Sequence, residues 1–220
     1  MDQDPSYAVA PHLRLARKDA ETQRDALVAI VQDCPDLMRC FHQARALDLP
    51  DWWIVSGAIY NQVWNHLTGK PDLYGVKDMD LFYFDTDVSY AAEDRIIQRG
   101  AMHFETPVPV EIRNQARVHL WYTDHFGQDY APLTKTTDGI DNFACKTHAI
   151  GMRLNKDDSF DIYAPFGLGD IFSFRLTPHI IRDNRATHLA KAKRQMALWP
   201  ELTFVPWPGD VCLPEADDHS

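Results

Sequence analysis

The amino-acid sequence predicts a single domain of the α+β class, in which short β-strands are interspersed with amphipathic helices. Its 220 residues are enough for one domain with a sizeable hydrophobic core. Apolar and polar residues alternate along short segments bounded by turn residues, most clearly at residues 76–84, as they do in half-buried strands. Elsewhere apolar residues recur at helical spacing, for example from about Asp19 to Asp33.

The composition along the chain predicts its boundaries. We expect residues 1–18 to form a flexible N-terminal segment, residues 19–208 to form the domain, with a helical lead-in at 19–50, and residues 209–220 to form a C-terminal tail. Within the lead-in, Pro35 can occupy the first turn of a second helix. The apolar face of that helix would carry Leu37, Phe41, Ala44 and Leu47.

A strand-to-helix corner is predicted at residue 56. Residues 51–56 form a short apolar strand that Gly57 ends, and residues 58–67 carry apolar side chains spaced for one helix face. The free N–H groups and the positive dipole end of such a helix can bind an anion, and glycine lets a phosphate approach the backbone. Ser56 and Gly57 are therefore candidate phosphate-binding residues, although such a pair more often forms only a turn.

Asp78 and Asp80 lie at the start of the strand predicted for residues 76–84. Because side chains alternate along a strand, the two carboxylates share one face, and Met79 and Leu81 occupy the other. Adjacent carboxylates repel each other, and burying either without a partner is costly. A Mg²⁺ ion between them would remove both problems and leave positions for phosphate oxygens. The alternative is a solvated strand end without function.

A third strand is predicted at residues 107–113. Pro107 and Pro109 favour an edge strand or the entry to a strand over a central position, because proline cannot donate to a neighbouring strand. Glu111 and Arg113 share one face of this strand. Glu111 could supply a third metal-binding carboxylate, or it could form an ordinary ion pair on an exposed face.

The same patterns predict the remaining elements. They are a helix at residues 90–99, strand-like alternation at 116–122, a short helix from 137 or 138, a hairpin of 147–154 and 159–164, a tight turn or short helix at 166–172, and a basic helix at 184–198.

Composition excludes some functions. A net charge of −10 argues against a broad electrostatic grip on nucleic acid, although a bound metal can still attract a phosphate locally.

The spacing of Cys34, Cys40, Cys145 and Cys212 matches no zinc or disulfide framework, so we expect reduced, mostly structural cysteines. Since the sequence has no signal segment and no apolar run long enough to cross a bilayer, it predicts a cytoplasmic protein.

Several motifs together resemble a known group of proteins. Ser56-Gly57, Asp78-Met79-Asp80 and Glu111 are similar to the motifs of the DNA polymerase β-like nucleotidyltransferase superfamily. More narrowly, the chain resembles a bacterial family of nucleotidyltransferases of unknown substrate. This second resemblance rests on longer motifs, at residues 58–61, 77–80, 114–119 and 164–168.

The resemblance implies a mixed β-sheet flanked by helices and an Mg²⁺-dependent enzyme. Asp78, Asp80 and Glu111 would hold two Mg²⁺ ions, with Mn²⁺ as a possible substitute. Ser56 and Gly57 would cradle the phosphates of a nucleoside triphosphate, with Tyr60 and Asn61 in the following helical turn as further phosphate-binding candidates. The transferred group would be a nucleoside monophosphate, and the acceptor is more readily a small molecule or a protein than a nucleic acid.

The chain departs from the family pattern at Tyr60, where related enzymes often have arginine. A tyrosine hydroxyl offers one neutral hydrogen bond where arginine offers a charge-assisted fork. Lys77, Arg113 and Arg117 are candidates to supply the missing charge, and we expect Arg113 first because it shares a strand face with Glu111. Two alternatives stay open: a nucleotide-binding module that has lost transfer activity, and a metal-dependent phosphohydrolase.

Overall fold

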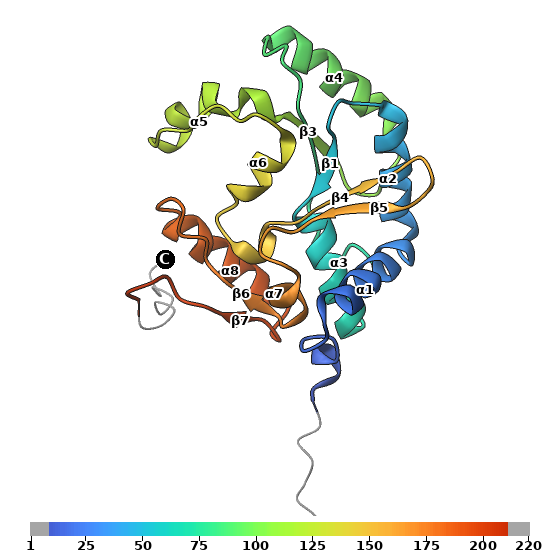
Figure 1. The fold of residues 1–220 in the computed structure, drawn as a ribbon, viewed down its shortest axis with the longest axis vertical. Helices are drawn as coiled ribbons and strands as arrows, with labels where there is room; N and C mark the ends of the chain where they lie inside the picture. The colour runs from blue at the N-terminus through green and yellow to red at the C-terminus, as the bar shows by residue number, and fades with distance from the viewer. Residues whose placement is uncertain (1–8, 211–220) are drawn as a thin grey trace, which may run out of the picture.

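The computed structural model describes residues 9–210, and its centre is a five-stranded mixed sheet flanked by helices (Figure 1). β2 and β3 pair in parallel, and the other neighbouring strands pair antiparallel. The α+β class is therefore confirmed, and β3 lies at an edge, as its preceding prolines predict. In spatial order the strands are β3 (Val110–Asn114), β2 (Met79–Tyr83), β1 (Trp53–Val55), β4 (Gly151–Leu154) and β5 (Phe160–Tyr163).

The helices begin close to where the sequence predicts them. Asp19 caps the first helix by accepting the Thr22 amide at 2.8 Å, and Pro35 occupies the first turn of the second. The α-helices are α1 (Ala20–Gln32), α2 (Pro35–Leu47), α3 (Gly57–Thr68), α4 (Tyr90–His103), α5 (Val118–Phe126), α6 (Thr136–Asp141), α7 (Gly169–Phe172) and α8 (Arg185–Leu198). Short 3₁₀ turns are η1 (Pro11–Leu13), η2 (Gln115–Arg117) and η3 (Lys146–His148), and a small parallel sheet pairs β6 (Arg175–Leu176) with β7 (Thr203–Phe204).

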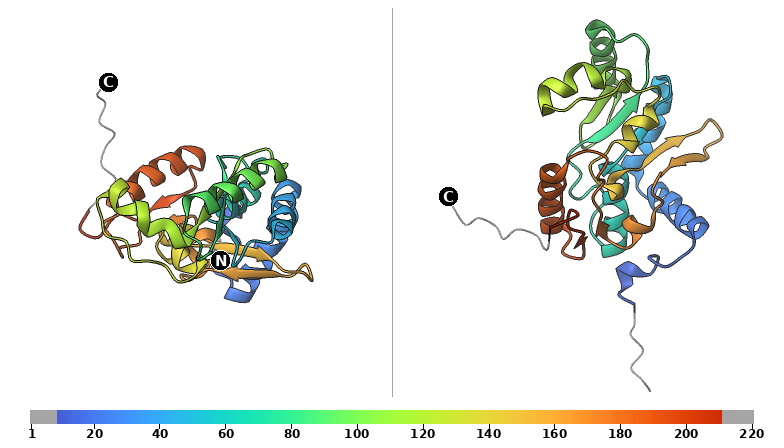
Figure 2. Two further views of the ribbon diagram at one scale, coloured as in Figure 1. Left: turned by 90° about the horizontal axis from the view of Figure 1, so that it is seen from above. Right: turned by 60° about the vertical axis from the view of Figure 1, so that its left-hand side comes forward.

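The two faces of the main sheet have different environments. Met79 and Leu81 of β2 point into the main core, which α1, α2, α3 and α4 cover. The alternate residues Asp80 and Phe82 lie on the other face, only partly buried. Figure 1 shows α5 and α6 on this second side, and Figure 2 shows α8 standing away from α1 and α2. α8 borders the main core, to which its Ala192 and the following Trp199 belong. The predicted alternation of β2 is therefore correct and leaves its acidic face accessible.

A smaller apolar cluster covers part of the second face. It contains Trp53 and Val55 of β1 together with Ile140 of α6. The start of α6 is fixed to the sheet because the Asp51 carboxylate accepts the Thr136 amide at 2.7 Å. Phe82 of β2 packs against this cluster, whereas the acidic residues Asp80 of β2 and Glu111 of β3 are not part of it.

The strand-like alternation at residues 116–122 was a wrong indication, because this segment is helical. β3 ends at Asn114, whose side chain accepts the Ala116 amide at 3.1 Å and turns the chain into η2 and α5. Leu120 on α5 is half exposed, so the alternation does not correspond to a buried sheet face. The helix predicted for residues 90–99 is also longer than expected and ends at His103.

Parts of the predicted terminal segments lie outside the described residues. This applies to residues 1–8 and 211–220, and therefore to Cys212. Within the described part, Leu13 and Leu15 pack against the main core. None of the helices in residues 9–210 combines the length and the apolar character needed to cross a membrane.

Candidate active site

Ser56 occupies a sharp corner between β1 and α3. Its backbone has φ 58° and ψ −117°, a conformation that is costly for a residue with a side chain. Its amide donates to the Ile150 carbonyl at 2.8 Å, and its side chain does not cap the helix. Among the described residues, the amides of Gly57 and Ala58 have no hydrogen-bond acceptor. The predicted corner is confirmed, and it presents free N–H groups at the positive end of α3.

The protein itself does not require glycine at position 57. A Cβ there would lie 3.7 Å from Asn61 Nδ2 and 3.8 Å from the Tyr60 hydroxyl, which are ordinary contacts, and the backbone φ is not left-handed. The missing side chain therefore leaves space for a group that is not part of the protein. Next to it, Asn61 is buried, and its Oδ1 has no hydrogen-bond partner among the described residues. Both features are suited to a ligand at this corner.

The register of β1, β2 and β3 brings the acidic residues together with this corner. Val55 pairs with Asp80, and Asp80 pairs with Glu111. Ser56 follows Val55 directly, so the corner and the two carboxylates lie at the same level of the sheet. Asp78 lies immediately before β2 and is partly buried. The sequence-predicted acids are therefore neighbours across adjacent strands.

Asp80 has the most perturbed carboxyl group at this site. Burial raises its pKa from 3.8 to about 6, and the negative charges of Asp78 and Glu111 add to this effect. The positive charges of Lys191 and Arg113 act in the opposite direction. Such a crowded, desolvated carboxylate is typical of functional sites, and a cation would relieve the repulsion.

Asp78, Asp80 and Glu111 carry the oxygen ligands that a hard divalent cation prefers, but they are not assembled as a closed metal site. Among residues 9–210, no three His, Cys, Asp or Glu side chains are grouped closely enough to hold an ion. One reason is that Glu111 forms an ion pair of 3.0 Å with Arg113. Carboxylates are the ligands that Mg²⁺ prefers, and the strand register sets Asp80 opposite Glu111.

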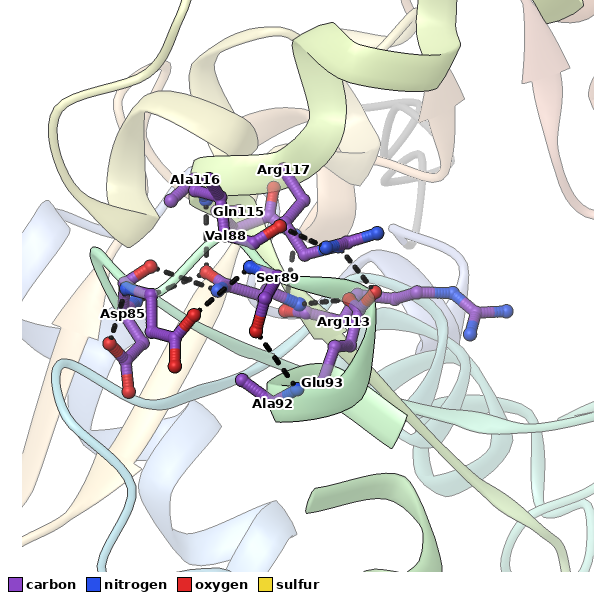
Figure 3. A network of polar contacts seen from close by, with 11 residues as sticks. Asp85, Val88, Ser89, Ala92, Glu93, Arg113, Gln115, Ala116 and Arg117 are labelled. Atoms are coloured by element: carbon purple, nitrogen blue, oxygen red, sulfur yellow. Dashed lines mark hydrogen bonds and ion pairs between the residues drawn. The ribbon is translucent and has the colours of Figure 1, made fainter. Parts of the chain in front are cut away.

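Arg117 is held in a structural network away from the acids. Its Nε pairs with Glu93 of α4 at 2.8 Å, and its Nη1 donates to the Val88 carbonyl (Figure 3). The same network includes the Asn114 amide, which donates to Glu93 at 2.9 Å. Arg117 therefore fixes α4 against the end of β3. Lys77 is an exposed side chain in the segment that enters β2.

Tyr60 is a packed core residue. It is 2% exposed, and its ring stacks on that of His148 with 4.6 Å between the centroids. Its hydroxyl accepts a hydrogen bond of 2.8 Å from Gln195 Nε2 of α8. The Gln195 Oε1 accepts in turn from His148 Nε2 at 2.9 Å. Burial lowers the pKa of His148 well below its usual value, so this histidine is neutral at physiological pH.

The structure adds α8 to the site, which the motifs did not indicate. Lys191 is partly buried, and it is the first of the positive charges that act on Asp80. Gln195, one turn further along, contacts Tyr60 as described above. The only signal in the sequence was the basic character of residues 184–198, which is also typical of a solvated helix.

Two adjoining cavities lie on this side of the sheet. One, of about 280 Å³, is lined by Asp80 and Arg113 together with aromatic side chains that include Phe82 and Tyr130. The other, of about 310 Å³, is lined by residues of α8 that include Lys191. The two share Asn142 and Phe143 in their walls. Asp80 on β2 therefore borders a largely aromatic cavity, and the adjoining cavity carries the positive charge of Lys191.

Comparisons with known proteins agree with this architecture. A family model described as nucleotidyltransferase matches residues 42–204. A structure solved by NMR and described as revealing a CCA-adding enzyme head domain matches with a TM-score of 0.69 and 25% sequence identity. That match covers 89% of this chain and 100% of the other. A comparison with curated proteins gave no match.

Proposed function

Because the chain belongs to the nucleotidyltransferase family that residues 42–204 match, we propose that it transfers a nucleoside monophosphate from a nucleoside triphosphate to an acceptor. The observation that carries this proposal is the strand register. It sets Asp80 and Glu111 level with each other and beside the Ser56-Gly57 corner. A phosphate at the corner would thus lie next to the carboxylates, which is the arrangement that phosphoryl transfer requires.

In this proposal the free amides at the start of α3 bind the phosphates. The Gly57 position leaves room for close approach, and Asn61 Nδ2, which would lie 3.7 Å from a Cβ at Gly57, can donate a hydrogen bond to a phosphate oxygen. The Ser56 hydroxyl, which does not cap the helix, can donate to a phosphate oxygen. These groups fix the donor and stabilise negative charge as it develops.

Asp78, Asp80 and Glu111 are the residues that would hold Mg²⁺. When bound, paired divalent ions polarise the phosphate and lower the pKa of an attacking hydroxyl. Asp78 and Asp80 stand closest in sequence and share a strand face, so they would form the common part of the site. Glu111 lies on the outer strand, and once released from Arg113 it would bind metal and take the proton of the acceptor.

The aromatic cavity next to Asp80 supports a small acceptor. Its volume of about 280 Å³ suits one small molecule or one protein side chain. The net charge of −10 does not favour a long nucleic-acid acceptor. The proposed acceptor is therefore a small molecule or a protein side chain, and it is not taken from the similarity to the CCA-adding enzyme head domain.

The proposal is tested with nucleoside triphosphates labelled on the α-phosphate. The protein is incubated with Mg²⁺ and each triphosphate in turn, with and without cell extract, and a labelled adduct is sought. Transfer predicts an adduct that Asp80→Asn abolishes. Labelled monophosphate without an adduct would indicate a phosphohydrolase, and binding without turnover would indicate a nucleotide-binding module.

A further inference from the structure

We propose that Lys191 of α8 is the cation that binds the triphosphate, in place of the basic residue that α3 lacks at position 60. The inference rests on the proposed function, because it assigns a further residue to the same phosphate site. It is carried by two hydrogen bonds that join α3 to α8 and its C-cap residue Trp199, by the cavity that Lys191 lines, and by the engagement of the other nearby cations.

Tyr60 can offer a ligand no positive charge, although its hydroxyl would lie 3.8 Å from a Cβ at Gly57. It is 2% exposed, stacks on His148 and accepts from Gln195 at 2.8 Å. The first turn of α3, residues 57–60, contains no cationic side chain. Any side-chain charge that adds to the proposed Mg²⁺ in balancing a triphosphate must therefore come from another element.

The candidates expected from the sequence are less suitable than Lys191. Arg113 pairs with Glu111 at 3.0 Å, and Arg117 pairs with Glu93 at 2.8 Å. Lys77 is exposed in the segment before β2. In contrast, Lys191 forms no close ion pair with a carboxylate among residues 9–210, although it is partly buried. A partly buried ammonium group without a close partner is suited to an anionic ligand.

Two hydrogen bonds fix the position of α8 along α3. Gln195 Nε2 donates to the Tyr60 hydroxyl at 2.8 Å, and the Trp199 indole donates to Asn65 Oδ1 at 3.1 Å. Gln195 and Trp199 lie about one helical turn apart, and their partners on α3, Tyr60 and Asn65, also lie about one turn apart in the same order. The two helices therefore run in the same direction.

Going one turn back along both helices places Lys191 level with Ser56. On α8, position 191 precedes Gln195 by one turn and lies on the same face. On α3, one turn before Tyr60 is the Ser56-Gly57 corner, where the phosphates are proposed to bind. The position agrees with the electrostatics, because the charges of Asp80 and Asp78 both act on the Lys191 ammonium group.

Lys191 also faces an open volume. It lines the cavity of about 310 Å³ together with Thr187 of α8, Asn184 just before α8 and Asn142 just after α6. A triphosphate seated at Ser56-Gly57 could extend its outer phosphates into this space. Lys191 would then neutralise their charge from the side opposite to the backbone amides.

The test uses Mg²⁺ with tripolyphosphate, which keeps the phosphate chain but has no base. Binding to the full-length protein is measured by calorimetry for the parent and for Lys191→Gln. Loss of one charge-assisted contact should weaken binding about tenfold or more. Lys191→Arg, which keeps the charge, should retain most of the affinity. The matched controls are Lys193→Gln and Arg194→Gln on the same helix, for which we expect changes below about twofold.

The outcomes separate this inference from the proposed function. If the parent binds tripolyphosphate and Lys191→Gln binds it equally well, or if Arg194→Gln is the variant that loses binding, only the role of Lys191 is refuted. If the folded parent binds neither tripolyphosphate nor any nucleoside triphosphate with Mg²⁺, the proposed function fails and this inference fails with it. Melting temperatures of all variants establish that they are folded.

Discussion

Replacing Asp80 by asparagine should stabilise the metal-free protein while it removes the proposed activity. The pKa of Asp80 is raised from 3.8 to about 6, chiefly by burial, so its charged form is disfavoured in the folded state. At pH 7.5 the carboxylate is charged in both the folded and the unfolded chain, and a shift of this size corresponds to a cost of roughly 3 kcal/mol. Asparagine has a similar shape and no charge, so the variant avoids up to that amount.

The pH dependence follows from the direction of the shift. Because the folded pKa is raised, the folded protein takes up a proton at Asp80 as the pH falls through about 6, and the penalty shrinks. Below about 3.8 Asp80 is protonated in both states and the penalty is gone. The advantage of Asp80→Asn should therefore be largest above pH 7 and small near pH 4.

The assay is thermal unfolding followed by circular dichroism in buffer with a chelator. For a domain of this size, about 2–4 °C per kcal/mol is expected, so the gain at pH 7.5 is at most roughly 6–12 °C. Added Mn²⁺ should raise the melting temperature of the parent and leave the variant unchanged, because ligands stabilise only the state that binds them.

Asp161, on the same sheet, provides a control in which replacing aspartate by asparagine should change the stability in the opposite direction. Asp161 of β5 accepts from Arg153 at 2.6 Å, and hydrogen bonds from Arg153 and Asn155 lower its pKa. Asp161→Asn should therefore destabilise the protein at pH 7.5, and the loss should shrink as the pH falls. The reasoning about Asp80 is refuted if its variant shows no gain at pH 7.5, or an equal gain at pH 4.5.

Three further predictions concern neighbouring residues. Asp78→Asn should weaken Mn²⁺ binding in calorimetric titrations about tenfold or more, since each carboxylate adds a charged ligand; unchanged affinity in this variant and in Asp80→Asn would exclude a joint site. Tyr60→Arg should lower the melting temperature by several degrees without tightening nucleotide binding, because it places a charge in a site that is 2% exposed; tighter binding would contradict the packing role of Tyr60. Arg113→Ala should strengthen Mn²⁺ binding severalfold, because it releases Glu111 from an ion pair of 3.0 Å, and weaker binding would show that Arg113 supports the metal site.

Local patterns in the sequence were sufficient to predict the acidic face and the corner. Alternation along a strand depends only on backbone geometry, so Asp78 and Asp80 could be assigned to one face and Met79 to the core. The strand-to-helix corner at Ser56-Gly57 follows in the same way from a change of apolar period. The edge position of β3 followed from Pro107 and Pro109, because proline cannot complete a ladder of hydrogen bonds.

The same local patterns did not show which cations serve the site. Arg113 shares a strand face with Glu111, but sequence proximity also allows the two to pair with each other, as they do. For Arg117, the deciding partner is Glu93 on a different helix. Alternation failed at residues 116–122 because a single side-chain cap at Asn114 redirects the chain into a helix.

Only the tertiary structure decided the surroundings of Tyr60 and Lys191. Whether Tyr60 faces a ligand or the core depends on α8, whose Gln195 is 135 positions away in the sequence and contacts its hydroxyl. The charge of Asp80 acts on Lys191 of α8, and no local periodicity encodes which distant helix brings a charge to the sheet. Residue types and spacing thus determined which groups this protein carries, and long-range packing determined which of them meet.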